Sequence, residues 1–130
     1  MKFKDLPKFH KNGKTPLTVE NARIKSVSIG NEDHGCLTAW LHLEFGNGGC
    51  GFGGFKLGSQ EGGNLEHRGW CAEFINRCIK IGVGEYGKWE DLEGQAIRVL
   101  NEGWGGGVVA VGHLLDDEWF CPRLEWANEK

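Results

Sequence analysis

Only a few polar side chains of this 130-residue chain have a spacing that could form a catalytic or metal-binding site. Asp33 and His34 are adjacent in a glycine-bounded stretch and could form a catalytic pair, although an Asp in such a turn more commonly bonds its own backbone. His42 and Glu44 would share one face of a strand, which suits two metal ligands, an acid–base pair or plain surface polarity. Neither pattern defines a catalytic site.

Other signatures of chemistry are missing. The glycine run from Gly51 to Gly58 lacks the Gly-Lys-Ser/Thr ending of a phosphate loop, and no Gly-x-Ser-x-Gly nucleophile turn occurs. The five cysteines form no Cys-x-x-Cys pair, and the histidines at 34, 67 and 113 have no partner at ligand spacing. We therefore predict no metal, no cofactor and no disulfide framework, and expect the thiols to be buried.

Tryptophan and arginine are better placed to hold a flat anionic ligand. Some of five tryptophans should lie at subunit interfaces or stack on a ligand, namely Trp40, Trp70, Trp104, Trp119 and Trp126. A guanidinium beside an aromatic ring can bind a nucleotide, with stacking for the base and paired hydrogen bonds for phosphate. Arg68, Arg98 and Arg123 are the candidates, with an ordinary salt bridge as the alternative for each. Arg77 is expected to be solvated.

Charge is distributed unevenly along the chain. Five of the fifteen cationic residues precede Pro16, and the remainder of the chain is acidic within a net charge of −3. This balance disfavours long nucleic acid as a partner, because such binding depends on a basic surface, but it allows a small anion. No stretch has the length of a membrane span or the apolar core of a signal peptide, so we expect a cytoplasmic protein without a membrane partner.

The spacing of apolar residues along the chain predicts the strands and the helix that would position these side chains. Residues 1–17 form a basic N-terminal arm, mobile or packed on an edge, and residues 18–130 form a single domain. Alternation predicts a three-strand meander, with a bulge near Lys25-Ser26 and a loop from Gly30 to Gly35. The interruption at Gly53-Gly54 indicates a second bulge, or close approach of a backbone or ligand. The three strands cover Thr18 to Ile29, Leu37 to Phe45 and Cys50 to Leu57.

In the second half of the chain, the spacing of the apolar residues changes from that of a strand to that of a helix. Residues 58–68 are predicted as a loop, followed by an amphipathic helix from Gly69 to Ile81 and an inward-facing turn from Tyr86 to Gly94. Gln95 to Leu100 and Val108 to Leu115 should form a C-terminal hairpin on which Trp119 and Phe120 dock. The predicted fold is α+β: an antiparallel sheet of about five strands, the meander plus the hairpin, with one main helix packed on it.

Three stretches of the chain resemble one family of phage proteins. They are VENARIKSVSIGNEDHGCLTAWLHLEFGNGGCGFGGFKL, the later IGVGEYGKWEDLEGQAIRV, and VGHLLDDEWFCPR near the end. They are similar to the "IENA-I … EDHG … GFGG", "V-GV … WEDL-G" and "IGH … WF-P" pattern of the first type of Thoeris anti-defence proteins. The resemblance covers roughly residues 19 to 123. The basic arm before Thr18 departs from the pattern.

This resemblance implies ligand binding without turnover. Members of the family are sponges that act in the host cytoplasm and sequester cyclic ADP-ribose isomers, such as glycocyclic ADP-ribose, made by bacterial TIR-domain immune proteins. It also implies a homo-oligomer, dimers arranged into hexamers, with nucleotide pockets between protomers and, in some members, separate sites for cyclic oligonucleotides. Family pockets use an aromatic platform, an Asn and an Arg, which map onto Asn101, Trp119 or Phe120, and Arg123. Arg68 and Arg98 are added on chemical grounds.

Two other functions stay open at this point. One is a small cytosolic nucleotide-processing enzyme that uses Asp33 and His34, or His42 and Glu44. The other is a phage interaction module without a small ligand. The lack of a recognisable catalytic constellation favours sequestration, and the sequence does not choose among the isomers.

Overall fold

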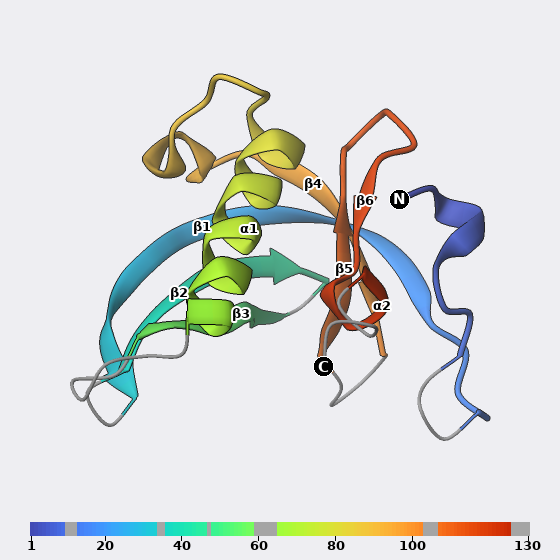
Figure 1. Ribbon diagram of the computed structural model, residues 1–130. Coiled ribbons are helices and arrows are strands. Elements are labelled where there is room, and N and C mark those ends of the chain that lie inside the picture. Colours follow the sequence, from blue (N-terminus) through green and yellow to red (C-terminus); the bar gives the residue numbers. More distant parts are fainter. Residues whose placement is uncertain (10–12, 34–35, 47, 59–64, 103–106, 126–130) are drawn as a thin grey trace.

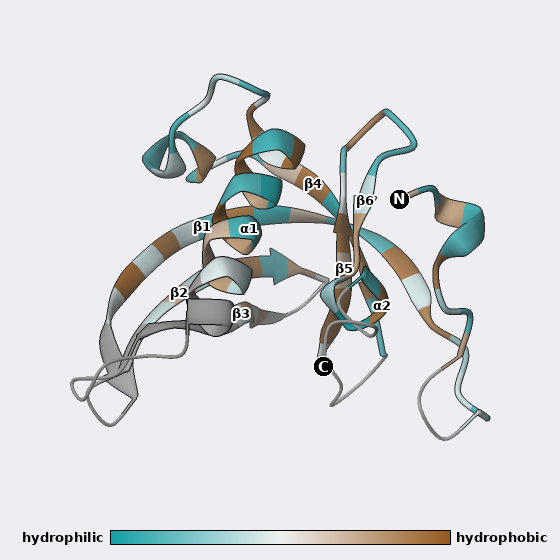
Figure 2. Cartoon of the chain, in the orientation of Figure 1, coloured by the Kyte–Doolittle hydropathy of each residue, from teal (hydrophilic) through white to brown (hydrophobic). Residues whose placement is uncertain are grey.

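Strand β1 is the element that joins the two halves of the sheet. The computed structural model describes residues 1–9, 13–33, 36–46, 48–58, 65–102 and 107–125, with side chains left undescribed at 31–33, 36–37, 54–58 and 65–68. Strand β1 (Thr18–Asp33) pairs through its first residues with β4 and through the rest with β2, and Arg23 pairs with both. Figure 1 shows the resulting arc of β1, and Figure 2 shows apolar and polar bands alternating along it.

The meander predicted at the start of the domain is confirmed. Strand β2 (Cys36–Phe45) pairs antiparallel with β1 and with β3 (Gly48–Gly58). Gly46 lies in the turn between β2 and β3 with φ of 59°, a conformation that favours glycine. The predicted loop from Gly30 to Gly35 is wrong in its first part, because residues 30–33 continue β1 and pair with β2.

Both predicted bulges are present. The β1–β2 register shifts between Ile24 and Ser26, so Lys25 is the extra residue; Ile24 and Val27, on either side of it, face the same core. The β2–β3 register shifts where Gly53 and Phe55 pair with neighbouring residues of β2. Gly53 is also a point of close approach: a Cβ atom there would lie 2.8 Å from the Phe74 ring of the helix.

Helix α1 (Leu65–Gly82) covers one face of the sheet (Figure 1). It begins four residues before the predicted start, so Arg68 lies in the helix and not in a loop. Its buried side carries the residues expected from the period of 3.6, and the core includes Cys71, Phe74, Cys78 and Ile81. The predicted inward turn is a 3₁₀ helix, Trp89–Leu92, in which Leu92 is fully buried.

The C-terminal hairpin consists of β4 (Ala96–Asn101) and β5 (Val108–Gly112). Trp119 and Phe120 do more than dock: they form a sixth strand, β6 (Trp119–Phe120), followed by the short helix α2 (Pro122–Glu125). The sheet order is β3-β2-β1-β4-β5-β6, with antiparallel neighbours throughout. The α+β prediction is confirmed, with six strands where about five were expected.

The sheet has a hydrophobic cluster on each face. The larger cluster lies between the sheet and α1 and includes Phe120. The smaller cluster includes Trp119, because consecutive residues of a strand point to opposite faces. Its other buried members are Leu6, Leu100, Val109, Ala110 and Cys121.

The first residues of the basic arm cover the smaller cluster. Leu6 is 5% exposed, and the ring centroid of Phe3 lies 5.7 Å from that of Trp119. The backbone N–H of Trp119 donates to the Met1 carbonyl at 2.8 Å, and the Met1 nitrogen donates to the Trp119 carbonyl at 3.0 Å. Residues 1–6 therefore pack on β6 at the edge of the sheet and on the smaller cluster. Within the described ranges, no helix has the length and apolar character needed to cross a membrane.

Candidate ligand-binding site

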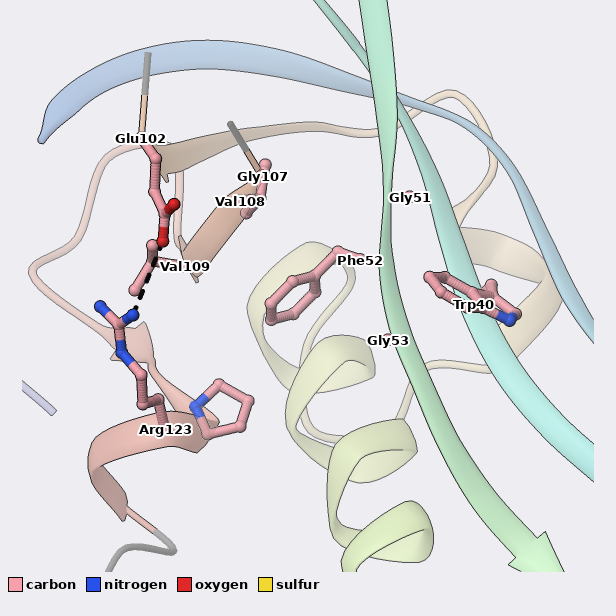
Figure 3. Close-up of a pocket in the computed structure, with 10 residues that line it drawn as sticks. Trp40, Gly51, Phe52, Gly53, Glu102, Gly107, Val108, Val109 and Arg123 are labelled. Atoms are coloured by element: carbon pink, nitrogen blue, oxygen red, sulfur yellow. Dashed lines mark ion pairs between the residues drawn. The ribbon is translucent and has the colours of Figure 1, made fainter. Parts of the chain in front are cut away.

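A cavity of about 260 Å³ lies where edge strand β3 approaches β5 and α2. Its apolar wall is formed by Phe52 of β3, Val108 and Val109 of β5, and Pro122 of α2. Figure 3 shows Trp40 at one side of this wall and Arg123 at the other. The cavity thus unites segments from the first and the last parts of the chain.

Glycines give the β3 side of the cavity its shape. Gly51 and Gly53 line it without side chains. The Trp40 ring covers Gly51, where a Cβ atom would lie 3.0 Å from Trp40 Cε3. Gly53 has φ of 131°, and a Cβ atom there would meet the Ala39 carbonyl oxygen at 2.5 Å. Glycine at these two positions therefore leaves room for the Trp40 ring beside Gly51, and for the Ala39 carbonyl and the Phe74 ring beside Gly53.

Arg123 and Glu102 are the ionisable side chains among the described residues of the cavity lining. Arg123 NH1 lies 3.6 Å from Glu102 Oε1, and the two side chains are 32% and 17% exposed. The pair joins α2 to the end of β4 across the cavity (Figure 3). At this separation it is an ion pair and not a hydrogen bond, so the guanidinium retains capacity to donate to a bound anion.

Helix α2 holds Arg123 in place through a network with α1. The helix begins at Pro122, a residue whose constrained φ suits the first helical position. Glu125 Oε2 accepts a hydrogen bond from the backbone N–H of Cys121 at 2.9 Å, and Arg77 of α1 pairs with the same carboxylate. The Arg77 guanidinium also lies 4.8 Å from the centroid of the Phe120 ring. The prediction of a solvated Arg77 is wrong.

Two of the predicted ligand residues stabilise the turn between β5 and β6. Arg98 donates from Nε to the His113 carbonyl at 2.8 Å and from NH2 to the Asp116 carbonyl at 2.7 Å. Its Cζ lies 4.9 Å from the Trp119 ring, which is fully buried. Neither residue lines the cavity, and these contacts give Arg98 a structural role.

The other predicted residues also differ in position. Asn101 is 3% exposed, and its Nδ2 donates to Glu20 Oε2 at 2.6 Å and to the Thr18 carbonyl at 3.3 Å. Phe120 is fully buried, so in the single chain it offers no open ring for stacking, and the same holds for Trp119. The side chain of Arg68 lies outside the described residues. Of the six predicted residues, Arg123 alone is among the described residues of the lining.

The six predicted ligand residues include neither Trp40 nor Glu102, although both line the cavity. Trp40 is one of the five tryptophans expected at an interface or on a ligand, and Glu102 has no distinguishing pattern. The useful signal was the interruption at Gly53-Gly54, which indicated close approach of a backbone or ligand. Gly53 is part of the lining, and Phe74 of α1 is packed against it.

His42 and Glu44 share the face of β2 opposite the buried Leu41 and Leu43, as the alternation predicts. His42 Nε2 lies 3.1 Å from Ser28 Oγ, in a hydrogen bond whose direction depends on the histidine tautomer. Glu44 is exposed, while His34 and the Asp33 side chain lie outside the described residues. In the described part of the chain, no group of three His, Cys, Asp or Glu side chains is arranged to hold a metal ion.

The described cysteines are unsuited to act as nucleophiles. Burial raises the pKa of the Cys71, Cys78 and Cys121 thiols, and it does the same for half-buried Cys50. Because the thiolate is the reactive form, these residues are unreactive near neutral pH.

Comparison with known proteins gives no further assignment: the chain matches no protein-family model, no curated protein and no solved structure. The functional argument therefore depends on the cavity and on the motifs described above. Two of those motifs meet at the cavity. The GFGG stretch contributes Gly51, Phe52 and Gly53, and the WF-P stretch contributes Pro122, directly before Arg123.

Proposed function

We propose that this protein binds and sequesters a cyclic ADP-ribose-type immune signal, such as glycocyclic ADP-ribose, without cleaving it. Sequestration in the host cytoplasm would block bacterial anti-phage defence. The observation that carries the proposal is the meeting of the GFGG and WF-P motifs at one cavity, beside Trp40 and Arg123. These motifs are distant in the sequence and belong to the pattern that the chain shares with Thoeris anti-defence proteins.

The chemistry of the lining suits each part of such a ligand. The Arg123 guanidinium can donate paired hydrogen bonds to a pyrophosphate. The Trp40 indole offers an aromatic surface for a base, and the wall of Phe52, Val108 and Pro122 excludes water. This combination of a mostly apolar wall with a few polar groups is typical of small-molecule sites.

The size of the cavity supports a site shared between protomers. Its volume of about 260 Å³ is below the roughly 300–1,000 Å³ usual for pockets that enclose a whole ligand. A single chain would therefore hold part of the nucleotide, and a second copy would cover the rest. The dimers and hexamers implied by the family resemblance meet this requirement.

The proposal is tested by calorimetric and thermal-shift titration with cyclic ADP-ribose isomers and with cyclic di- and trinucleotides. A ligand that binds the folded state should raise the melting temperature with its concentration, and mass spectrometry after boiling should recover it intact.

Arg123→Ala should weaken binding about 10- to 100-fold, because charge-assisted hydrogen bonds contribute about 1.5–3 kcal/mol. Arg23→Ala is the matched control, because Arg23 is exposed on β1 away from the cavity lining. Binding of none of these nucleotides would contradict the proposal.

An enzyme that cleaves the same signal is the second candidate. It is favoured by the Ser28–His42 hydrogen bond of 3.1 Å, a separation suited to a nucleophile and its base. Ser28 pairs across the strands with Trp40, so the dyad is near one wall of the cavity. This candidate predicts that the ligand returns cleaved, and that Ser28→Ala and His42→Ala return it intact. No specific observation favours the third possibility, an interaction module without a small ligand.

A further inference from the structure

The hydrogen bond between Ser28 and His42 lies beside Trp40, on the face of the sheet opposite α1. Ser28 pairs directly across the strands with Trp40, and His42 follows Trp40 on the same face of β2. Ser28 Oγ and His42 Nε2 are 3.1 Å apart, and all three side chains are partly buried. Ser28 and His42 are not part of the cavity lining, so this pair extends the Trp40 end of the cavity along the sheet.

The Trp40 ring is supported by the backbone of β3. A Cβ atom at Gly51 would lie 3.0 Å from Trp40 Cε3, so the indole packs directly against the glycine. In the described ranges, no aromatic ring and no cation stacks on Trp40. The partly exposed indole is therefore an aromatic surface that no described ring already occupies, and such a surface suits a flat ligand.

The Ser28–His42 pair retains hydrogen-bonding capacity for a ligand. If the Ser28 hydroxyl donates to Nε2, then Nδ1 of His42 carries the free donor and Ser28 Oγ can accept. If Nε2 donates to Oγ instead, the hydroxyl is the free donor and Nδ1 can accept. The pair is neutral in both tautomers and offers a donor beside an acceptor. The described residues form no further hydrogen bond with either side chain.

We propose that Ser28 and His42 are specificity-determining residues, which hydrogen-bond to the edge of a purine base stacked on Trp40. This inference rests on the proposed function and names the part of the ligand that is recognised here. Adenine presents an amino donor beside a ring nitrogen acceptor, which complement the acceptor and the donor of the pair. Stacking on an aromatic side chain, combined with hydrogen bonds to the base edge, is a common mode of recognising a single base.

The position of the cavity agrees with this assignment. At about 260 Å³ it is too small to enclose a whole nucleotide, and Arg123 lies at the side away from Trp40 (Figure 3). A nucleotide whose phosphates bind Arg123 would therefore direct its base toward Trp40. An uncharged pair at that end adds selectivity for the base without repelling the phosphates.

The test compares adenosine 5′-monophosphate with purine riboside 5′-monophosphate, which lacks only the amino group of the base. In calorimetry on the full chain, the wild type should bind the adenine nucleotide about 3- to 10-fold more tightly, as expected for neutral hydrogen bonds. Ser28→Ala and His42→Phe should each reduce this ratio to about one and leave the affinity for the purine riboside nucleotide unchanged. A merely structural role of the pair would instead weaken both nucleotides alike.

Two further variants serve as controls. Ser28→Thr keeps the hydroxyl and should keep the preference for the adenine nucleotide. Ser26→Ala removes the same group from the same face of β1, next to His42 in the register, and should also keep the preference. An equal fall of the ratio in Ser26→Ala and Ser28→Ala would contradict the assignment to the Ser28–His42 pair. The melting temperature of each variant reports its folding.

The possible results separate this inference from the proposed function. No preference in the wild type, or no binding of either mononucleotide, overturns the inference. A ratio that falls in both variants supports it, and if no cyclic ADP-ribose isomer binds, only the proposed function fails. Binding of an isomer together with an unchanged ratio in both variants does the reverse. Release of free adenine by the wild type but not by Ser28→Ala would assign the pair to catalysis and overturn the inference.

Discussion

Arg77 in α1 and Glu125 in α2 form an ion pair through two contacts, NH1 to Oε1 and NH2 to Oε2. Arg77 NH2 also donates to the carbonyl of Trp119 at 3.0 Å, so one guanidinium joins the long helix, the last strand and the short helix. Arg123 lies in that short helix. The pair therefore connects the stability of the fold with the geometry of the cavity.

Replacing Arg77 by Ala should lower the free energy of unfolding by about 1.5–3 kcal/mol, since it removes hydrogen bonds made by a charged group. It should also weaken ligand binding, because α2 and Arg123 lose their anchor. Urea denaturation and calorimetry measure the two effects. The control Arg23→Ala should change stability by less than about 0.5 kcal/mol, as expected for an exposed residue. Equal stability of the two variants would show that the pair does not hold α2.

Gly112→Ala should destabilise the protein by about 1–3 kcal/mol, because the added atom overpacks the core. A Cβ atom at Gly112 would lie 2.5 Å from Trp119 Cδ2, and the Trp119 ring is enclosed. Gly69→Ala makes the same chemical change at a helical position with nothing within 4 Å, and should stabilise by about 0.5–1 kcal/mol. In thermal and urea unfolding, Gly112→Ala should be less stable than the wild type and Gly69→Ala more stable. Two neutral changes would refute this account of Gly112.

Leu6→Ala should cost about 2–3 kcal/mol, because Leu6 of the N-terminal arm is buried in the smaller cluster. Phe9→Ala should cost less than about 0.5 kcal/mol, because the Phe9 side chain is 52% exposed. Denaturation with urea measures both. If the two substitutions had similar small effects, the arm would not contribute to the folded state as the structure implies.

The buried Cys78 thiol should make stability decrease above pH 9. Burial raises its pKa in the folded state above the ordinary value of 9.0, so at high pH the unfolded chain loses a proton that the folded chain keeps. The stabilisation is complete below pH 9 and is lost as the pH rises, by about 1.4 kcal/mol per pH unit for one thiol. Urea unfolding between pH 8 and 10 tests this slope. Cys78→Ala should reduce it, and an unchanged slope would assign the loss to other groups.

Gly51→Val should reduce ligand affinity about tenfold with little loss of stability, if Trp40 is the stacking surface. The added side chain would displace the Trp40 ring, because a Cβ atom at Gly51 already lies 3.0 Å from it. Gly48→Val introduces the same side chain in the same strand with nothing within 4 Å of its Cβ and serves as the control. Calorimetry, with whichever nucleotide binds in the titration proposed above, compares the affinities of the two variants. Unchanged affinity in Gly51→Val would exclude Trp40 from the site.

Local periodicity was sufficient to predict the secondary structure and the fold class. The meander, both bulges, the helix and the C-terminal hairpin all follow from the spacing of apolar residues and glycines, because a strand or helix must present one apolar face to the core. The start of α1 and the continuation of β1 through residues 30–33 did not follow. Neither boundary has a strong apolar period, and pairing with β2 extends β1 past Gly30.

The contacts and the burial of individual side chains were decided only by the tertiary structure. Arg77 has the spacing of a solvated residue, and it is held by α2 because the chain returns there after β6. Trp119 is buried because the N-terminal arm covers the face of the sheet opposite α1. Trp40, Glu102 and Arg123 have no common pattern in the sequence, and they line one cavity because the curved sheet brings β3 to β5 and α2. Such long-range contacts depend on how elements pack and not on local sequence.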